Sequence, residues 1–101
     1  MGEMEWTTAL KALGEENRLR LLRLLMQHEH SVTELSVALG LTTYNTSKHL
    51  RILKEAGLIS MRKEAQQRMY DIAPAMQKKL KKNGNVLDLG CCQFQFDKLP
   101  A

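Results

Sequence analysis

Residues 42–57, TTYNTSKHLRILKEAG, decide the fold that this sequence predicts. Thr46, Leu50 and Leu53 recur at the i, i+4 and i+7 spacing of one helix face, which predicts an amphipathic helix packed against a core. A threonine at either of the first two positions can cap the helix, and Gly57 suits the left-handed residue that follows a helix end. The opposite face carries polar and cationic side chains, namely Thr43, Tyr44, Asn45, Ser47, Lys48 and Arg51.

The concentration of these polar groups in the first two turns suits a helix that enters the DNA major groove. Base edges there present a pattern of hydrogen-bond donors and acceptors that such side chains can read. A polar helix face can also be merely solvated, and the neighbouring segments distinguish the two interpretations.

The segment just upstream, residues 31–39, predicts a second short helix. Ser31 and Glu34 form the S-x-x-E spacing of a capping box, and Gly40 ends the helix. Two short helices joined through a glycine, the second with polar groups displayed, are the pattern of a helix-turn-helix. The expected apolar stripe of this helix is Leu35, Ala38 and Leu39.

Two further helices are expected before this pair and one after the segments that follow it. Residues 7–14 form a short helical pattern, and residues 17–27 are apolar over a wide arc, as in a central core helix. Pro74 suits the first turn of a last helix over residues 74–82, with Met76 and Leu80 facing inward.

Residues 58–64 and 68–73 predict two strands, because apolar and polar residues alternate in both. The loop between them lacks the glycine that a tight hairpin prefers, so its turn type stays open. Arg62, Lys63 and Arg68 lie near the tip. A basic hairpin after a DNA-reading helix is a wing that can reach phosphates or the minor groove.

Composition favours a single domain with a nucleic-acid partner. The chain has 101 residues, 44% hydrophobic and 26% charged, and a net charge of +4. Residues 48–82 hold 10 basic and 3 acidic residues, a local excess of +7 that overlaps the polar helix and the wing. No apolar run approaches the roughly 20 residues of a membrane span, and no signal peptide is visible, so we expect a cytoplasmic protein.

The chain from about residue 10 to 73 resembles the ArsR/SmtB family of winged-helix metalloregulatory repressors. The matching segments are LKALGEENRLRLLRLL, VTELSVALGL, SKHLRILKEAGLI and RKEAQQRMYDI. The resemblance implies a mainly α (α+β) winged helix-turn-helix fold with about five helices, a two-stranded wing and an apolar C-terminal tail. It also implies a homodimer, paired through its first and last helices, on a palindromic DNA operator with half-sites roughly 34 Å apart.

The resemblance assigns DNA contacts by position. The recognition-helix contacts would be Thr43, Tyr44, Asn45, Ser47, Lys48 and His49, with Arg51 on the same polar face; the wing contacts would be Arg62, Lys63, Gln67 and Arg68. Residues 1–84 would then form the DNA-binding and dimerisation domain, and residues 85–101 a tail.

The usual sensor sites of that family are missing. Where the family carries ELCVC, residues 34–38 read ELSVA, and the last helix lacks the Asp and His ligands of the zinc site. The adjacent thiols of Cys91 and Cys92 remain, and such soft ligands suit trivalent arsenic or antimony as an inducer. A third ligand is not evident, and no cofactor is expected for folding. Two alternatives stay open for these cysteines, a redox switch and simple packing.

An enzyme is the weakest interpretation. The segment VLDLGC resembles the glycine-rich opening of methyltransferases that bind S-adenosylmethionine, but its second glycine is replaced by Cys92 and only nine residues follow. No catalytic triad, paired carboxylates or P-loop is present. A winged-helix protein-interaction module without DNA binding is the other rival.

Overall fold

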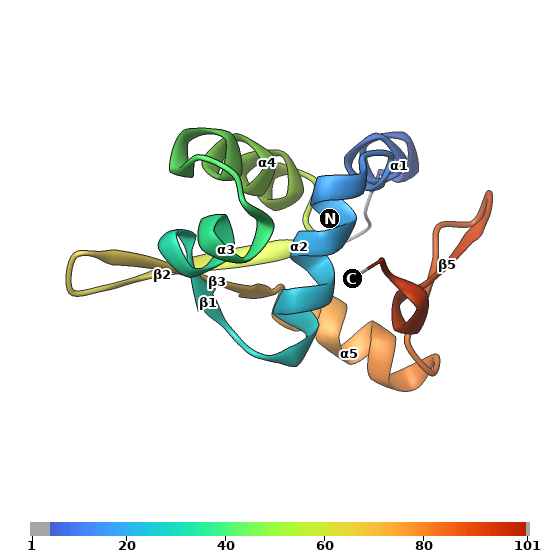
Figure 1. Ribbon diagram of the computed structural model, residues 1–101. Coiled ribbons are helices and arrows are strands. Elements are labelled where there is room, and N and C mark those ends of the chain that lie inside the picture. The colour runs from blue at the N-terminus through green and yellow to red at the C-terminus, as the bar shows by residue number, and fades with distance from the viewer. Residues whose placement is uncertain (1–4, 101) are drawn as a thin grey trace.

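Helices and a small antiparallel sheet surround one apolar core in the computed structural model, which describes residues 5–100 (Figure 1). In chain order the elements are α1 (Trp6–Leu13), α2 (Glu16–Gln27), β1 (His30–Ser31), α3 (Val32–Leu39), α4 (Thr43–Glu55), β2 (Ile59–Glu64), β3 (Gln67–Ile72), α5 (Pro74–Lys82), β4 (Val86–Asp88), β5 (Gln93–Gln95) and the 3₁₀ turn η1 (Phe96–Lys98). No helix of residues 5–100 is long and apolar enough to cross a bilayer.

The helix α4 forms as predicted. The Thr42 hydroxyl caps it by accepting a hydrogen bond from the Asn45 N–H at 3.0 Å. At the other end Gly57 has a φ of 84°, and the N–H of Leu58 donates to the Leu53 carbonyl at 3.0 Å, which completes a Schellman motif. The predicted inward face of Thr46, Leu50 and Leu53 is fully buried. The sequence therefore predicted both ends and the orientation of this helix.

The preceding helix α3 carries the predicted capping box, and Gly40 ends it with a φ of 70°. The predicted stripe is wrong at Ala38, which is exposed, whereas Ser36 is buried. The physical reason is that the Ser36 hydroxyl donates to the Thr33 carbonyl at 2.9 Å, so that it enters the core without an unpaired polar group. The buried face of α3 therefore consists of Leu35, Ser36 and Leu39.

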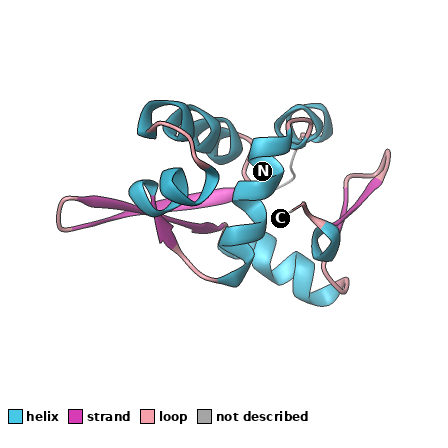
Figure 2. Cartoon of the chain, viewed as in Figure 1, coloured by secondary structure: helices cyan, strands magenta, loops and turns pink. Residues whose placement is uncertain are grey.

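The sheet has one strand more than the sequence predicted. The strand β1 pairs with the middle of β3, so that the order is β1-β3-β2 and β3 lies at the centre. A two-residue strand is too short to show alternation, which is why sequence reasoning missed it. The hairpin of β2 and β3 extends beyond the helices as the predicted wing (Figure 2).

The wing turns over only two residues, Ala65 and Gln66, because Glu64 pairs directly with Gln67. Ala65 has a φ of 56°, a backbone conformation that costs a residue with a Cβ atom about 1 kcal/mol. The sequence left this turn open because its usual glycine is missing. The tight register of the two strands imposes the conformation instead.

Ala65→Gly is therefore expected to stabilise the protein by about 0.5–1 kcal/mol, since glycine adopts a positive φ without strain. Urea denaturation followed by circular dichroism would measure the change. Gln66→Gly is the matched control, because Gln66 does not have a positive φ. That control should be neutral or destabilising, and equal stabilisation by both variants would contradict the explanation.

The apolar tail packs against the rest of the chain. It forms a small hairpin of β4 and β5 followed by η1, and Leu87, Phe96 and Leu99 join the main core. Arg23 of α2 donates to the Leu99 carbonyl at 2.9 Å. The helix α5 also buries its two predicted core residues.

Candidate DNA-binding surface

The exposed side of α4 and the wing enclose an open groove of about 380 Å³. One wall is the exposed stripe of α4 and the other is the adjoining face of β2 and β3. The lining residues are Tyr44, Ser47, Lys48, Arg51, Lys54, Met61, Arg68 and Tyr70. Four of them are cations, and we call this the α4–wing groove.

The N-terminal half of α4 presents the predicted recognition residues to solvent. Thr43, Asn45 and Ser47 are exposed, and Tyr44 exposes 71% of its surface. The Lys48 ammonium lies 5.5 Å from the centre of the Tyr44 ring, within the range of a cation–π contact. This contact places a positive charge beside hydrogen-bonding groups on a single helical surface.

The two faces of the wing differ in charge. Directly opposed residues of antiparallel strands share a face, so Lys63 and Arg68 lie together, on the same face as Met61 and Tyr70. Within residues 5–100 neither Lys63 nor Arg68 forms an ion pair. Their positive charges therefore remain available on the side of the wing that borders the α4–wing groove.

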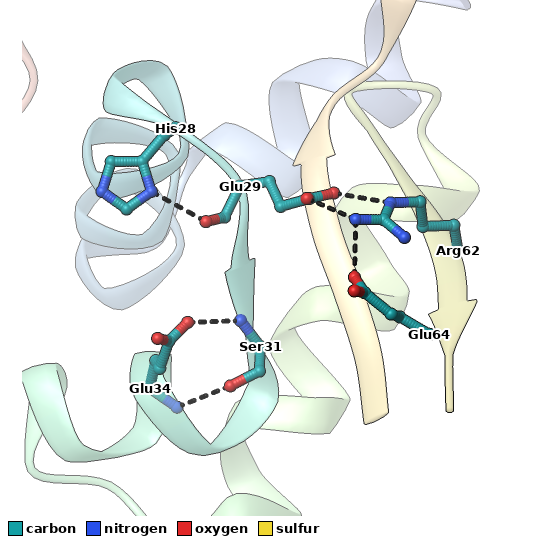
Figure 3. A network of polar contacts seen from close by, with 6 residues as sticks. All are labelled: His28, Glu29, Ser31, Glu34, Arg62 and Glu64. Carbon is teal, nitrogen blue, oxygen red and sulfur yellow. Dashed lines mark hydrogen bonds and ion pairs between the residues drawn. The ribbon is translucent and has the colours of Figure 1, made fainter. Parts of the chain in front are cut away.

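Arg62 lies on the other face of the wing, with two carboxylates around it. Its Nε and Nη2 donate to the two carboxylate oxygens of Glu29 at 2.9 and 2.6 Å, and Nη2 also lies 2.8 Å from Glu64 (Figure 3). These bonds lower the pKa of Glu29 and raise that of Arg62. The fourth predicted wing residue, Gln67, is exposed and pairs with Glu64 across the strands.

His49 is turned toward α2 and is partly buried. Its Nδ1 lies 3.2 Å from Nη1 of Arg18, which also donates to the carbonyls of Lys11 and Ala12 at the end of α1. Sequence reasoning missed Arg18, because nothing in the spacing indicates a contact 31 residues away. It also missed Lys54, although Lys54 follows Arg51 by three residues on the same helix face.

The two cysteines lie at the tip of the β4–β5 hairpin and are exposed. Their Sγ atoms are 3.4 Å apart, and Gly90, directly before them, has a φ of 90° that bends the chain at this point. The hydrogen bond with Cys91 is the main cause that raises the pKa of Cys92. Within residues 5–100 no cluster of three His, Cys, Asp or Glu side chains could hold a metal ion.

These cysteines therefore fit a soft ion only in part. Two bonds of about 2.3 Å, the length of a zinc–thiolate bond, can span the separation of the two thiols. A third ligand, if such an ion bound, would have to come from a small thiol, from water or from another chain. The segment VLDLGC forms a strand and a hairpin turn rather than the strand-to-helix turn that a nucleotide-type cofactor requires.

The helix-turn-helix, the wing and the cationic groove together define a winged helix-turn-helix DNA-binding protein. Residues 15–61 match the family described as "Bacterial regulatory protein, arsR family". The chain is 42% identical over 76 residues to the transcriptional activator HlyU of Vibrio cholerae. This match covers 70% of this chain and 70% of HlyU. The chain belongs to the ArsR family and is a transcriptional regulator, not an enzyme.

Two further relatives agree with this assignment. The biofilm growth-associated repressor of Agrobacterium fabrum is 41% identical over 64 residues, which covers 63% of this chain and 55% of that protein. The solution structure of the homodimeric winged helix-turn-helix domain Mb0332 of Mycobacterium bovis superposes with a TM-score of 0.69 at 32% identity. The match covers 77% of this chain and 72% of that one.

Proposed function

We propose that this protein is a repressor that binds a palindromic operator as a homodimer, with α4 in the major groove and the wing along the backbone. The observation that carries the proposal is the α4–wing groove, where cations of two separate elements face one space. Helix side chains there would read base edges, while Lys63 and Arg68 would hold phosphates.

The helix α1 supports the dimer. Trp6 exposes 45% of its surface and Leu10 36%, and the two lie one turn apart, as expected of a surface that a second copy covers. By contrast, α5 buries Met76 and Leu80 within its own protomer and leaves mainly lysines exposed. The first helix is thus the better supported part of the expected interface.

A gel shift with operator DNA at increasing salt tests DNA binding. Phosphate contacts release counterions, so log K should fall linearly with log salt by about 0.9 per phosphate contact. A flat salt dependence, or no binding at low salt, would favour the protein-interaction module instead.

We propose further that residues 85–101 sense an inducer and residues 1–84 bind DNA and dimerise. The exposed thiols of Cys91 and Cys92 support a soft trivalent ion of the arsenite or antimonite class as the inducer. The raised pKa of Cys92 makes that thiol slower to react with peroxide, because fast oxidation needs a low-pKa thiolate. The β4–β5 hairpin, whose tip carries the two cysteines, and the wing lie at opposite ends of the molecule (Figure 1). The inducer would therefore act through the core or the dimer, not by blocking DNA.

Replacing both cysteines by serine is expected to give a folded repressor that arsenite no longer releases from DNA. The reason is that serine hydroxyls are poor ligands for thiophilic ions. Fluorescence anisotropy of labelled operator during an arsenite titration would measure release.

Matched titrations distinguish the alternatives for the cysteines. Release of the wild type by peroxide but not by arsenite would indicate a redox switch, in which two thiols lose two protons and two electrons to peroxide and form a disulfide and water. Undiminished arsenite release from the double-serine variant would show that the tail is not the sensor. Retained DNA affinity of that variant serves as the folding control.

A further inference from the structure

We propose that Arg62 positions the wing and does not contact DNA, so that only one face of the wing meets the duplex. The inference rests on the proposed DNA-binding function and removes Arg62 from the wing contacts that the family resemblance assigned. Arg62 forms an ion-pair cluster with Glu29 and Glu64, which we call the wing clamp. In this proposal the wing clamp fixes the angle of the wing.

The sheet register places the wing clamp away from the groove. Side chains alternate along β2, so Arg62 and Glu64 point to the face opposite Lys63. Glu29 directly precedes β1, which lies on the far side of β3 from β2. Figure 3 shows the Glu29 carboxylate reaching over β3 to the guanidinium of Arg62. The contact therefore joins both edges of the sheet across its central strand.

The charges within the clamp leave no free cation for a phosphate. One guanidinium faces two carboxylates, so the cluster carries a formal charge of −1, and a phosphate approaching it would be repelled. The planar guanidinium of Arg62 donates to the Glu29 carboxylate through two nitrogens. The single ammonium group of a lysine cannot reproduce this bidentate geometry. Single exposed ion pairs contribute little to the stability of a protein, but a bidentate pair within a network of charges contributes more.

The clamp ties the wing to the start of the helix-turn-helix. Glu29 lies in the connection between α2 and β1, and α3 begins directly after β1. Directly after this connection, the capping box of Ser31 and Glu34 fixes the start of α3 (Figure 3). Loss of the clamp would remove one of the contacts that hold the wing to these elements, while the pairing of β1 with β3 would remain. The distance of Lys63 and Arg68 from the recognition helix would then be less tightly fixed.

Glu29→Ala gives a test in which the two roles predict opposite signs. Removal of a carboxylate beside DNA should tighten binding if Arg62 were a restrained phosphate contact. If Arg62 positions the wing, we expect operator binding to weaken about fivefold. Arg62→Lys, which keeps the charge, should weaken binding to a similar degree, and the double variant should be no worse than either single one. Glu55→Ala on the exposed side of α4 is the control for charge and should bind at least as well as the wild type.

The salt dependence separates this inference from the proposed function. The Arg62→Lys and Glu29→Ala variants should keep the wild-type slope of log K against log salt, because no phosphate contact is lost. Thermal denaturation of each variant checks that the fold survives. Tighter DNA binding by Glu29→Ala, or a flatter slope of log K against log salt in Arg62→Ala, would overturn the positioning role of Arg62. The proposed DNA-binding function would be unaffected by either result. A wild type without salt-dependent binding would instead remove the proposed function itself.

Discussion

Replacement of Lys48 and Arg68 together by alanine is expected to weaken operator binding at least about a hundredfold. The two cations come from opposite walls of the α4–wing groove, one on the recognition helix and one on β3. A charge-assisted hydrogen bond contributes about 1.5–3 kcal/mol, and a homodimer would lose four such cations. Anisotropy titrations at several salt concentrations would also show a slope flatter by up to about 3.6, at about 0.9 for each phosphate contact.

The control for this variant removes the same charge elsewhere. Lys78 and Lys82 are exposed on α5, which lies across the core from α4 (Figure 1), so their replacement by alanine should cost much less affinity. Both double variants should unfold at nearly the wild-type temperature, since none of the four side chains is buried. Equal losses of affinity in the two variants would show that net charge, and not the groove, governs binding.

Leu50→Ala is expected to lower the free energy of unfolding by about 3 kcal/mol. Leu50 has no exposed surface and packs from α4 into the core. Truncation of a buried leucine removes its transfer free energy and leaves a cavity, which together cost 2–5 kcal/mol. Since domains of this size have a total stability of about 5–15 kcal/mol, the variant should be markedly less stable. Urea denaturation at fixed protein concentration would measure the loss.

A second residue of the same helix serves as the comparison. Ile52 is of the same size as Leu50 but exposes 39% of its surface. Ile52→Ala should therefore cost clearly less, about 1 kcal/mol, because less apolar area returns to water. Similar losses for the two variants would mean that α4 does not bury the face that its sequence pattern predicts.

Much of this site could be predicted because its signals are local. The threonine cap, the capping box and the glycine after α4 each depend on residues within one or two helical turns. The same period that orients Leu50 inward leaves Tyr44, Lys48 and Arg51 outward. The helix-turn-helix follows from these local patterns, and the wing follows from the alternation of apolar and polar residues in its two strands.

Other residues acquired their place only from long-range pairing. In the sequence Arg62 looks like one more cation of the wing. The register of β1, β3 and β2 nevertheless places it beside Glu29. His49 follows Lys48 on the recognition helix, yet the rotation of α4 places it against Arg18, 31 residues earlier. Such pairs leave no period or spacing in the sequence.

The sequence by itself determined which segments become helices and wing, and which face of α4 is polar, because those properties depend on neighbours a few residues apart. Only the tertiary structure decided that Ser36 is buried in place of Ala38, and that Arg62 binds carboxylates while Lys63 and Arg68 remain unpaired. The physical reason is that strand register and helix packing bring together side chains that are distant in the chain. Whether a charged side chain is paired within the protein or is left available for DNA is therefore decided only when the chain folds.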